Sequence, residues 1–120
     1  LRTAESYFWK ANCKPPGDKF KLADMEIRLQ TARAQLFYNA QLIDKGIYDG
    51  MLGSVTKTCV SEMVFDVANQ ALQIFGGYGY SREYPVEKLL RDARIFSLFE
   101  GTNEIQRMII GGTLVPKKRN

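Results

Sequence analysis

Histidine is absent from the 120 residues, and its absence excludes more chemistry than any other feature of the composition. Ser-His-Asp triads, Cys-His pairs and His-Glu-x-x-His zinc sites all require an imidazole, so this chain alone cannot build them. Acid-base catalysis would therefore depend on one of the 13 carboxylates, a lysine, a tyrosine or a cysteine.

Cysteines and long hydrophobic runs are also scarce. Cys13 and Cys59 form no Cys-x-x-Cys motif, which fits neither a zinc site nor a dense disulfide framework and favours a reducing compartment. No segment approaches the roughly 18 apolar residues of a transmembrane helix, and the first residues lack a charged start followed by an apolar stretch. We therefore expect neither a membrane span nor a secretion signal.

The charge is weakly basic, with a formal net charge of +4, and the basic residues are scattered. The one basic run is Lys117-Lys118-Arg119, which we interpret as a solvated end segment. Nucleic-acid binding needs a basic stripe interleaved with aromatic residues, and the sequence contains none. At 13.7 kDa the chain has the size of a single domain, for which we expect no nucleic-acid partner.

Apolar residues recur every three or four positions in four segments, which predicts four helices. The first runs from Asp18 as its N-cap to Gly46 at its end, and the second from Met51 to Phe75. Pro85 opens the third, and Thr102 caps a fourth that reaches about Thr113. The predicted inward positions are Leu22, Met25, Leu29, Ala32, Leu36, Ala40 and Ile43, then Val60, Met63, Val67, Ala71 and Ile74, then Val86, Leu89, Leu90, Ala93 and Phe96, and finally Ile105, Met108 and Ile109.

No alternating strand pattern occurs, so the sequence predicts an all-α, antiparallel four-helix bundle over residues 18–120. Residues 1–17 lack a sustained period and contain Pro15-Pro16-Gly17, which favours a lead-in segment. The glycine-rich run Gly76-Gly77-Tyr78-Gly79 ends the second helix. Such broad apolar faces on a short bundle also predict that a second copy or another domain covers them.

Four sequence blocks carry a family resemblance. They are Gln73-Ile74-Phe75-Gly76-Gly77-Tyr78-Gly79-Tyr80, Glu83-Tyr84-Pro85-Val86-Glu87-Lys88, Arg91-Asp92-Ala93-Arg94 and Phe99-Glu100-Gly101-Thr102-Asn103-Glu104-Ile105-Gln106-Arg107. In this order and spacing they resemble the C-terminal helical domain of the acyl-CoA dehydrogenases, FAD enzymes that introduce an α,β double bond into acyl-CoA thioesters. Lys21–Met25 and Thr31–Arg33 resemble the first helix of that domain, which extends the similarity to roughly 100 residues.

The resemblance implies partners that this chain does not contain. Family members carry an N-terminal helical domain and a middle β domain, and FAD and the thioester lie in the cleft that the domains share. A homodimer or homotetramer, an electron-transfer flavoprotein as redox partner, and the bacterial cytoplasm or mitochondrial matrix are implied as well. The lead-in departs from the family's Arg-x-x-Phe-Gly-Lys flavin contact, because only Phe8 and Lys10 match it.

Glu100 aligns with the usual position of the family's catalytic base. Removal of the α-proton requires a carboxylate within about 3 Å of the α-carbon, in a dry pocket that raises its pKa. The resemblance also implies that the amide N–H of Glu100 donates to the thioester oxygen, and that Gly101 lets the backbone approach the substrate. The alternative is an inert acidic residue at a turn between helices.

The resemblance further implies two sets of FAD contacts. Gln73, Ile74, Phe75, Gly76 and Gly77 would touch the adenosine diphosphate part of FAD on a neighbouring subunit, whereas Thr102 and Glu104 would contact the flavin of their own subunit. Helix termination alone would also explain Gly76 and Gly77, and capping alone would explain Thr102. The leading interpretation is therefore a dehydrogenase domain. The alternatives are a related oxidase and a non-catalytic helical oligomerisation module, the latter distinguished by its flavin content.

Overall fold

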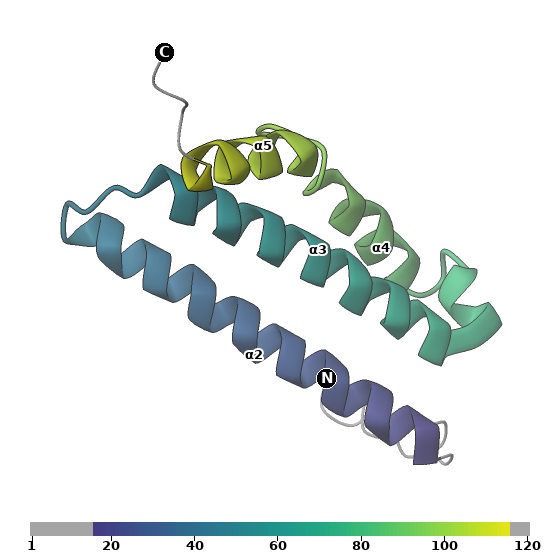
Figure 1. Ribbon diagram of the computed structural model, residues 1–120. Coiled ribbons are helices and arrows are strands. Elements are labelled where there is room, and N and C mark those ends of the chain that lie inside the picture. Colours follow the sequence, from purple (N-terminus) through teal and green to yellow (C-terminus); the bar gives the residue numbers. More distant parts are fainter. Residues whose placement is uncertain (1–15, 116–120) are drawn as a thin grey trace.

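The computed structural model describes residues 16–115, which form four α-helices and one 3-10 turn, with no strand in that range (Figure 1). The elements are α2 (Pro16–Asp44), α3 (Gly50–Phe75), η1 (Gly76–Tyr80), α4 (Val86–Ile95) and α5 (Asn103–Leu114). The predicted all-α fold with four helices is thereby confirmed. The predicted contacts of Phe8 and Lys10 and the basic run at 117–119 lie outside the described residues.

Helix α3 is the centre of the arrangement, and every other described element contacts it (Figure 1). Helix α2 runs antiparallel along one side of α3, as predicted, while α4 and α5 return along the other side. Within residues 16–115, α2 has no backbone contact with α4 or α5. The bundle is therefore open, with α3 separating two layers of helix.

Local signals fix most helix ends where the sequence predicts them. Thr102 caps α5 as predicted, by accepting a hydrogen bond from the Ile105 N–H at 3.4 Å. Asp49, for which no role was predicted, caps α3 by accepting one from the Leu52 N–H at 3.0 Å. Gly46, at φ 76°, ends α2 in the left-handed conformation that glycine adopts without strain.

The start of α2 differs from the prediction. The helix begins at Pro16, so Asp18 lies in its first turn and is not the N-cap; its carboxylate instead lies 3.5 Å from the Lys21 ammonium. A proline is tolerated in the first turn because that N–H has no partner within the helix. Pro16 and Gly17 thus belong to the helix, whereas residues 1–15 of the predicted lead-in lie outside the described range.

The predicted core is confirmed in part: Ala32, Val86 and Ala93 are buried as predicted, and most of the predicted positions on α2 and α3 are half-buried. Among the described residues, these three are the buried hydrophobic ones. The buried residues of α3 are instead small and hydroxylated, namely Ser54, Thr56, Thr58 and Ser61. Small side chains let helices approach closely, and their hydroxyls find acceptors at short range: Thr56 donates to the Leu52 carbonyl at 2.8 Å and accepts from Gln35 of α2 at 3.1 Å.

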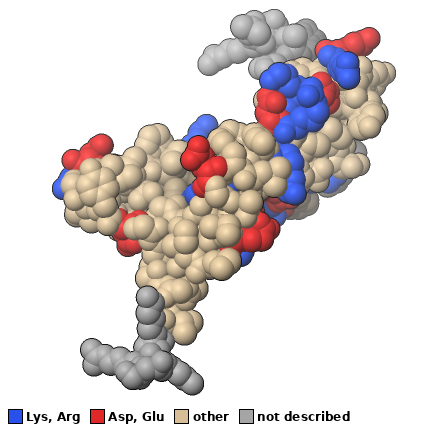
Figure 2. Space-filling model, turned by 90° about the horizontal axis from the view of Figure 1, so that it is seen from above, with Lys and Arg blue, Asp and Glu red and all other residues tan. Residues whose placement is uncertain are grey.

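Many predicted core residues of the other helices are exposed in the structure. They are Leu36, Ala40, Ile43, Leu89, Phe96, Ile105, Met108 and Ile109. Periodicity marks them as one stripe of a helix, but each remains exposed in the described part of the chain, because α2 contacts neither α4 nor α5 there. Figure 2 shows the molecule from above, where clusters of mixed charge alternate with broad surface free of Lys, Arg, Asp and Glu. Apolar surface of this extent is typical of a contact region.

Candidate functional site

Glu100 lies on the loop between α4 and α5, in an uncommon backbone conformation. Its φ is 54°, and it is the one non-glycine residue with positive φ in the described part of the chain. Gly101 follows at φ 83°. A left-handed residue with a side chain costs about 1–2 kcal/mol, which the surrounding contacts must offset. The strain is therefore located at the residue that the sequence predicts as a base.

Side chains from two helices hold this turn. Gln106 of α5 donates from Nε2 to the Glu100 carbonyl at 3.2 Å, and Lys57 of α3 donates from Nζ to the Gly101 carbonyl at 2.8 Å. A Cβ on Gly101 would lie 2.9 Å from Gln106 Nε2, so glycine also leaves room for that contact. The N–H of Glu100 donates no hydrogen bond to any residue in the range 16–115. It remains available to an acceptor on a ligand.

An apolar cavity of about 370 Å³ adjoins the loop. Its walls come from α2, α3 and the loop itself, with Glu100 as the one carboxylate among them. The apolar lining consists of Leu36, Val60, Val64, Phe96 and Phe99. The rings of Phe96 and Phe99 stand edge to face, 5.4 Å apart. These walls place apolar surface beside the carboxylate, although Glu100 itself is exposed in the described part of the chain. A base for carbon acids works best where water is excluded, so a further element would have to cover this side of the loop.

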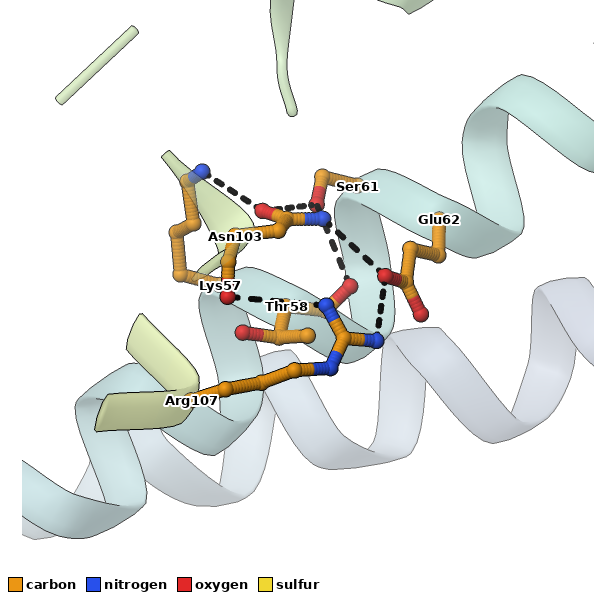
Figure 3. A network of polar contacts seen from close by, with 6 residues as sticks. All are labelled: Lys57, Thr58, Ser61, Glu62, Asn103 and Arg107. Atoms are coloured by element: carbon orange, nitrogen blue, oxygen red, sulfur yellow. Dashed lines mark hydrogen bonds and ion pairs between the residues drawn. The ribbon is translucent and has the colours of Figure 1, made fainter. Parts of the chain in front are cut away.

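Asn103, the first residue of α5, is the centre of a polar network beneath the loop (Figure 3). Its side chain is buried, with 3% of its surface exposed. The amide Oδ1 accepts from Lys57 Nζ at 2.7 Å, and Nδ2 donates to Ser61 Oγ at 3.0 Å and to Glu62 Oε1 at 3.3 Å. Its backbone N–H donates to the Ser97 carbonyl at 3.1 Å, so Asn103 joins the loop to α3.

Arg107 extends the network by one turn of α5. Its Nη2 donates to Glu62 Oε1 at 2.6 Å, and its Nη1 donates to the Asn103 carbonyl at 3.5 Å (Figure 3). Both charged side chains are about half exposed, which weakens the ion pair by solvent screening. The buried part of the network, around Asn103, contributes most of its rigidity.

Thr58 Oγ1 is the one fully buried side-chain oxygen or nitrogen in the described part of the chain that finds no hydrogen-bond partner. We expect Thr58→Val to leave stability unchanged or raise it by up to about 1 kcal/mol, because a buried hydroxyl without a partner bears an uncompensated desolvation cost. Urea-induced unfolding compares the two chains. Ser61→Ala is the control and is expected to destabilise, since Ser61 accepts from Asn103. Marked destabilisation by Thr58→Val would show that the hydroxyl has a partner.

The predicted FAD contacts lie in two separate places. Gln73, Ile74, Phe75, Gly76 and Gly77 form the end of α3 and the start of η1, while Thr102 and Glu104 lie at the start of α5. Ser61, which meets α5 through Asn103, is about 21 Å along the α3 axis from Phe75, at 1.5 Å per residue. The fold therefore does not bring the two sets together, consistent with contacts to two different flavins.

Each place has features that suit its predicted ligand. Gly76 has φ 60°, and a Cβ added to Gly76 or Gly77 would meet no atom within 4 Å, so the backbone there is open to close approach. Gln73 is exposed beside them and offers both a donor and an acceptor. Thr102 and Glu104 lie at a helix N-terminus, where backbone N–H groups favour anions and acceptor atoms.

The pKa of the Glu104 carboxyl is held below its ordinary value of 4.5, first by a backbone N–H at the start of α5 and then by the Thr102 hydroxyl. A depressed folded-state pKa means that ionised Glu104 stabilises the fold at higher pH. This contribution is present above pH 4.5 and is lost as the pH falls through the folded-state pKa. Ionised Glu104 therefore stabilises the N-terminus of α5.

Sequence reasoning predicted Glu100, Gly101, Thr102 and Glu104 but missed the residues that hold them, namely Lys57, Ser61, Asn103 and Gln106. One signal was present: Lys57 and Ser61 are four positions apart, so these two polar side chains share one face of α3. No group of cysteine and carboxylate side chains within residues 16–115 could hold a metal ion. In that range no helix is both long and apolar enough to cross a membrane.

Comparisons with known proteins agree on one family. Residues 10–115 match the family described as acyl-CoA dehydrogenase, C-terminal domain. An acyl-CoA dehydrogenase of Bacillus subtilis is 46% identical over 99 residues, covering 82% of this chain and 26% of the relative. The Acetobacterium woodii subunit of a caffeyl-CoA reductase-Etf complex is 39% identical over 98 residues, covering 82% of this chain and 26% of the relative.

A solved structure shows the same likeness in three dimensions. Butyryl-CoA dehydrogenase from Megasphaera elsdenii superposes with a TM-score of 0.83 at 41% identity, covering 87% of this chain and 27% of that chain. The chain therefore spans about a quarter of the length of the relatives it matches.

Proposed function

Since this chain belongs to the acyl-CoA dehydrogenase family and corresponds to its C-terminal domain, we propose that it supplies the general base and part of the FAD site for α,β-dehydrogenation of acyl-CoA thioesters. The observation that carries this proposal is the setting of Glu100. It is the one carboxylate lining an apolar cavity, on a left-handed turn held from two helices. An inert acidic residue at a turn would need none of these features.

The proposed reaction breaks two carbon–hydrogen bonds of the acyl chain. The Glu100 carboxylate would accept the α-proton, and FAD, when bound, would supply the acceptor for the hydride that leaves the β-carbon, so that oxidation of the thioester to its α,β-unsaturated form would balance. The N–H of Glu100 is suited to donate to the thioester oxygen and so to stabilise the negative charge that develops there. Gly101 would let the backbone approach the substrate beside the base.

Thr102 and Glu104 would hold the flavin of the same subunit, and Gln73 to Gly77 would hold the adenosine diphosphate part of a flavin in a neighbouring subunit. The separation of the two sets along α3 supports this division. Contacts to the flavins of two subunits would require a homodimer or a homotetramer.

The exposed apolar faces of the described helices indicate that further domains or subunits cover them. We propose that N-terminal and middle domains and a second copy of the chain cover them, since few apolar side chains of the described residues are buried. The likeness to a subunit of an Etf complex supports an electron-transfer flavoprotein as the redox partner. The Bacillus subtilis and Acetobacterium woodii relatives are bacterial, which favours the bacterial cytoplasm over the mitochondrial matrix.

A hybrid enzyme tests the proposal. This chain replaces the matching stretch of the Megasphaera elsdenii short-chain acyl-CoA dehydrogenase, to which it is 42% identical over 108 residues. We expect the purified hybrid to contain FAD and to show flavin bleaching on addition of butyryl-CoA without oxygen. The unmodified Megasphaera elsdenii enzyme is the positive control. A hybrid that assembles without flavin would instead support the non-catalytic oligomerisation module, and rapid reoxidation of the reduced flavin by oxygen would support an oxidase.

A further inference from the structure

We propose that Lys57 is a positioning residue for Glu100: its ammonium fixes the left-handed turn of Glu100 and Gly101 and so determines where the carboxylate lies. This inference rests on the proposed role of Glu100 as the base. Lys57 is on α3 and reaches the loop between α4 and α5, where it donates a 2.8 Å hydrogen bond to the Gly101 carbonyl. It has no ion-pair partner within residues 16–115.

The second acceptor of Lys57 is itself fixed in orientation. Asn103 Oδ1 accepts from Lys57 Nζ at 2.7 Å, while its Nδ2 faces the Glu62 carboxylate at 3.3 Å. Turning the amide over would place its NH₂ group against the ammonium and its oxygen against the carboxylate, so electrostatics permits one orientation only. The ammonium therefore binds two acceptors, one at each end of the Gly101-to-Asn103 segment. Figure 3 shows its contact with Asn103 and the network that fixes the Asn103 amide.

A charged donor suits this task because hydrogen bonds from an ammonium are stronger than those between neutral groups. The Glu100 turn is strained. Without the Lys57 ammonium, the Gly101 carbonyl loses its donor, and only the Glu100 carbonyl keeps one, from Gln106. We expect the turn to relax toward negative φ, which moves the carboxylate relative to the cavity. Lys57 also lines the cavity, so the substituting side chain must keep its length there. Substrate binding would then change little, since the displaced carboxylate acts on the α-proton and not on the rest of the thioester.

The kinetic test uses the hybrid enzyme with Lys57→Met, which keeps the length of the side chain without the ammonium. A base displaced by about 1 Å loses on the order of a hundredfold in rate, so we expect the rate of flavin reduction per bound flavin to fall about ten- to a hundredfold. KM should stay within about threefold of the unsubstituted hybrid. The isotope effect with α-deuterated butyryl-CoA should rise, because proton removal becomes more rate-limiting.

Lys88→Met is the matched control, since Lys88 is an exposed lysine paired with Asp92 on α4, away from the loop. It should leave the rate and the isotope effect unchanged. A purely structural role for Lys57 would instead lower the flavin content and leave the rate per bound flavin and the isotope effect unaltered, and this result would overturn the proposal. If Lys57→Met does not assemble, Lys57→Gln, which keeps a neutral donor, is measured in the same way.

A second measurement needs no catalysis. In the 120-residue chain, the amide signal of Thr102 in NMR spectra reports on the Gly101 carbonyl, because the two belong to one peptide group. Lys57→Met should shift the Glu100 and Thr102 signals, and Lys88→Met should not. Unshifted signals would overturn the proposal whether or not the hybrid is active. If Glu100→Gln abolishes flavin reduction while Lys57→Met leaves it intact, the role of the base stands and only the positioning role fails.

Discussion

Glu100→Gln in the hybrid enzyme is expected to slow flavin reduction by butyryl-CoA by about 10²- to 10⁴-fold, the usual contribution of a positioned general base. Glutamine keeps the shape and the hydrogen-bonding reach of glutamate but does not accept the α-proton. Substrate binding should persist, because the apolar cavity and the N–H of residue 100 remain. Stopped-flow measurement of flavin bleaching at saturating butyryl-CoA gives the rate directly.

Two further variants make this result specific. Glu100→Asp retracts the carboxylate by one methylene, and a displacement of about 1 Å is expected to cost on the order of a hundredfold in rate. Glu104→Gln should have a far milder effect, since Glu104 lies in the first turn of α5 and its carboxyl interacts with the Thr102 hydroxyl. If Glu100→Gln reduced flavin at the parental rate while Glu104→Gln did not, the base would be misassigned and the Glu100 turn would have a structural role only.

Gly79→Ala is expected to destabilise the chain by about 1–3 kcal/mol, the usual cost of forcing extra volume into a packed site. Gly79 is buried in η1, and a Cβ there would lie 2.8 Å from the Leu72 carbonyl oxygen and 2.8 Å from Phe75 Cβ. The first of these is a backbone atom of α3, so relief requires η1 to move away from the helix. That movement would also disturb the contact between the rings of Phe75 and Tyr84, which have their centroids 6.0 Å apart.

Gly77→Ala is the matched control for this effect. It lies in the same 3-10 turn, but a Cβ at Gly77 would meet no atom within 4 Å. We expect its stability to stay within about 0.5 kcal/mol of the parent, as for most surface substitutions. Urea-induced unfolding followed by circular dichroism compares the three chains. Equal midpoints for Gly79→Ala and Gly77→Ala would mean that η1 does not pack against the end of α3 as the structure has it.

The sequence alone determined the features that depend on neighbouring residues. Thr102 caps its helix, and Gly46 and Gly76 end theirs, because each acts on backbone groups within a few positions. The resemblance carried by the blocks from Gln73 to Arg107 likewise identified the family, which the match over residues 10–115 confirms. Helix ends and family membership therefore follow from residues that are close together along the chain.

Only the tertiary structure decided which helix faces are covered and how the loop is held. Helical periodicity gives a stripe but not its partner, so Leu36 and Met108 were predicted to be buried although α2 and α5 contact only α3 among the described elements. The contact of Lys57 with Asn103 spans 46 positions and leaves no periodic signal. The left-handed turn of Glu100 depends on donors from α3 and α5, and such strain persists only where distant groups offset its cost.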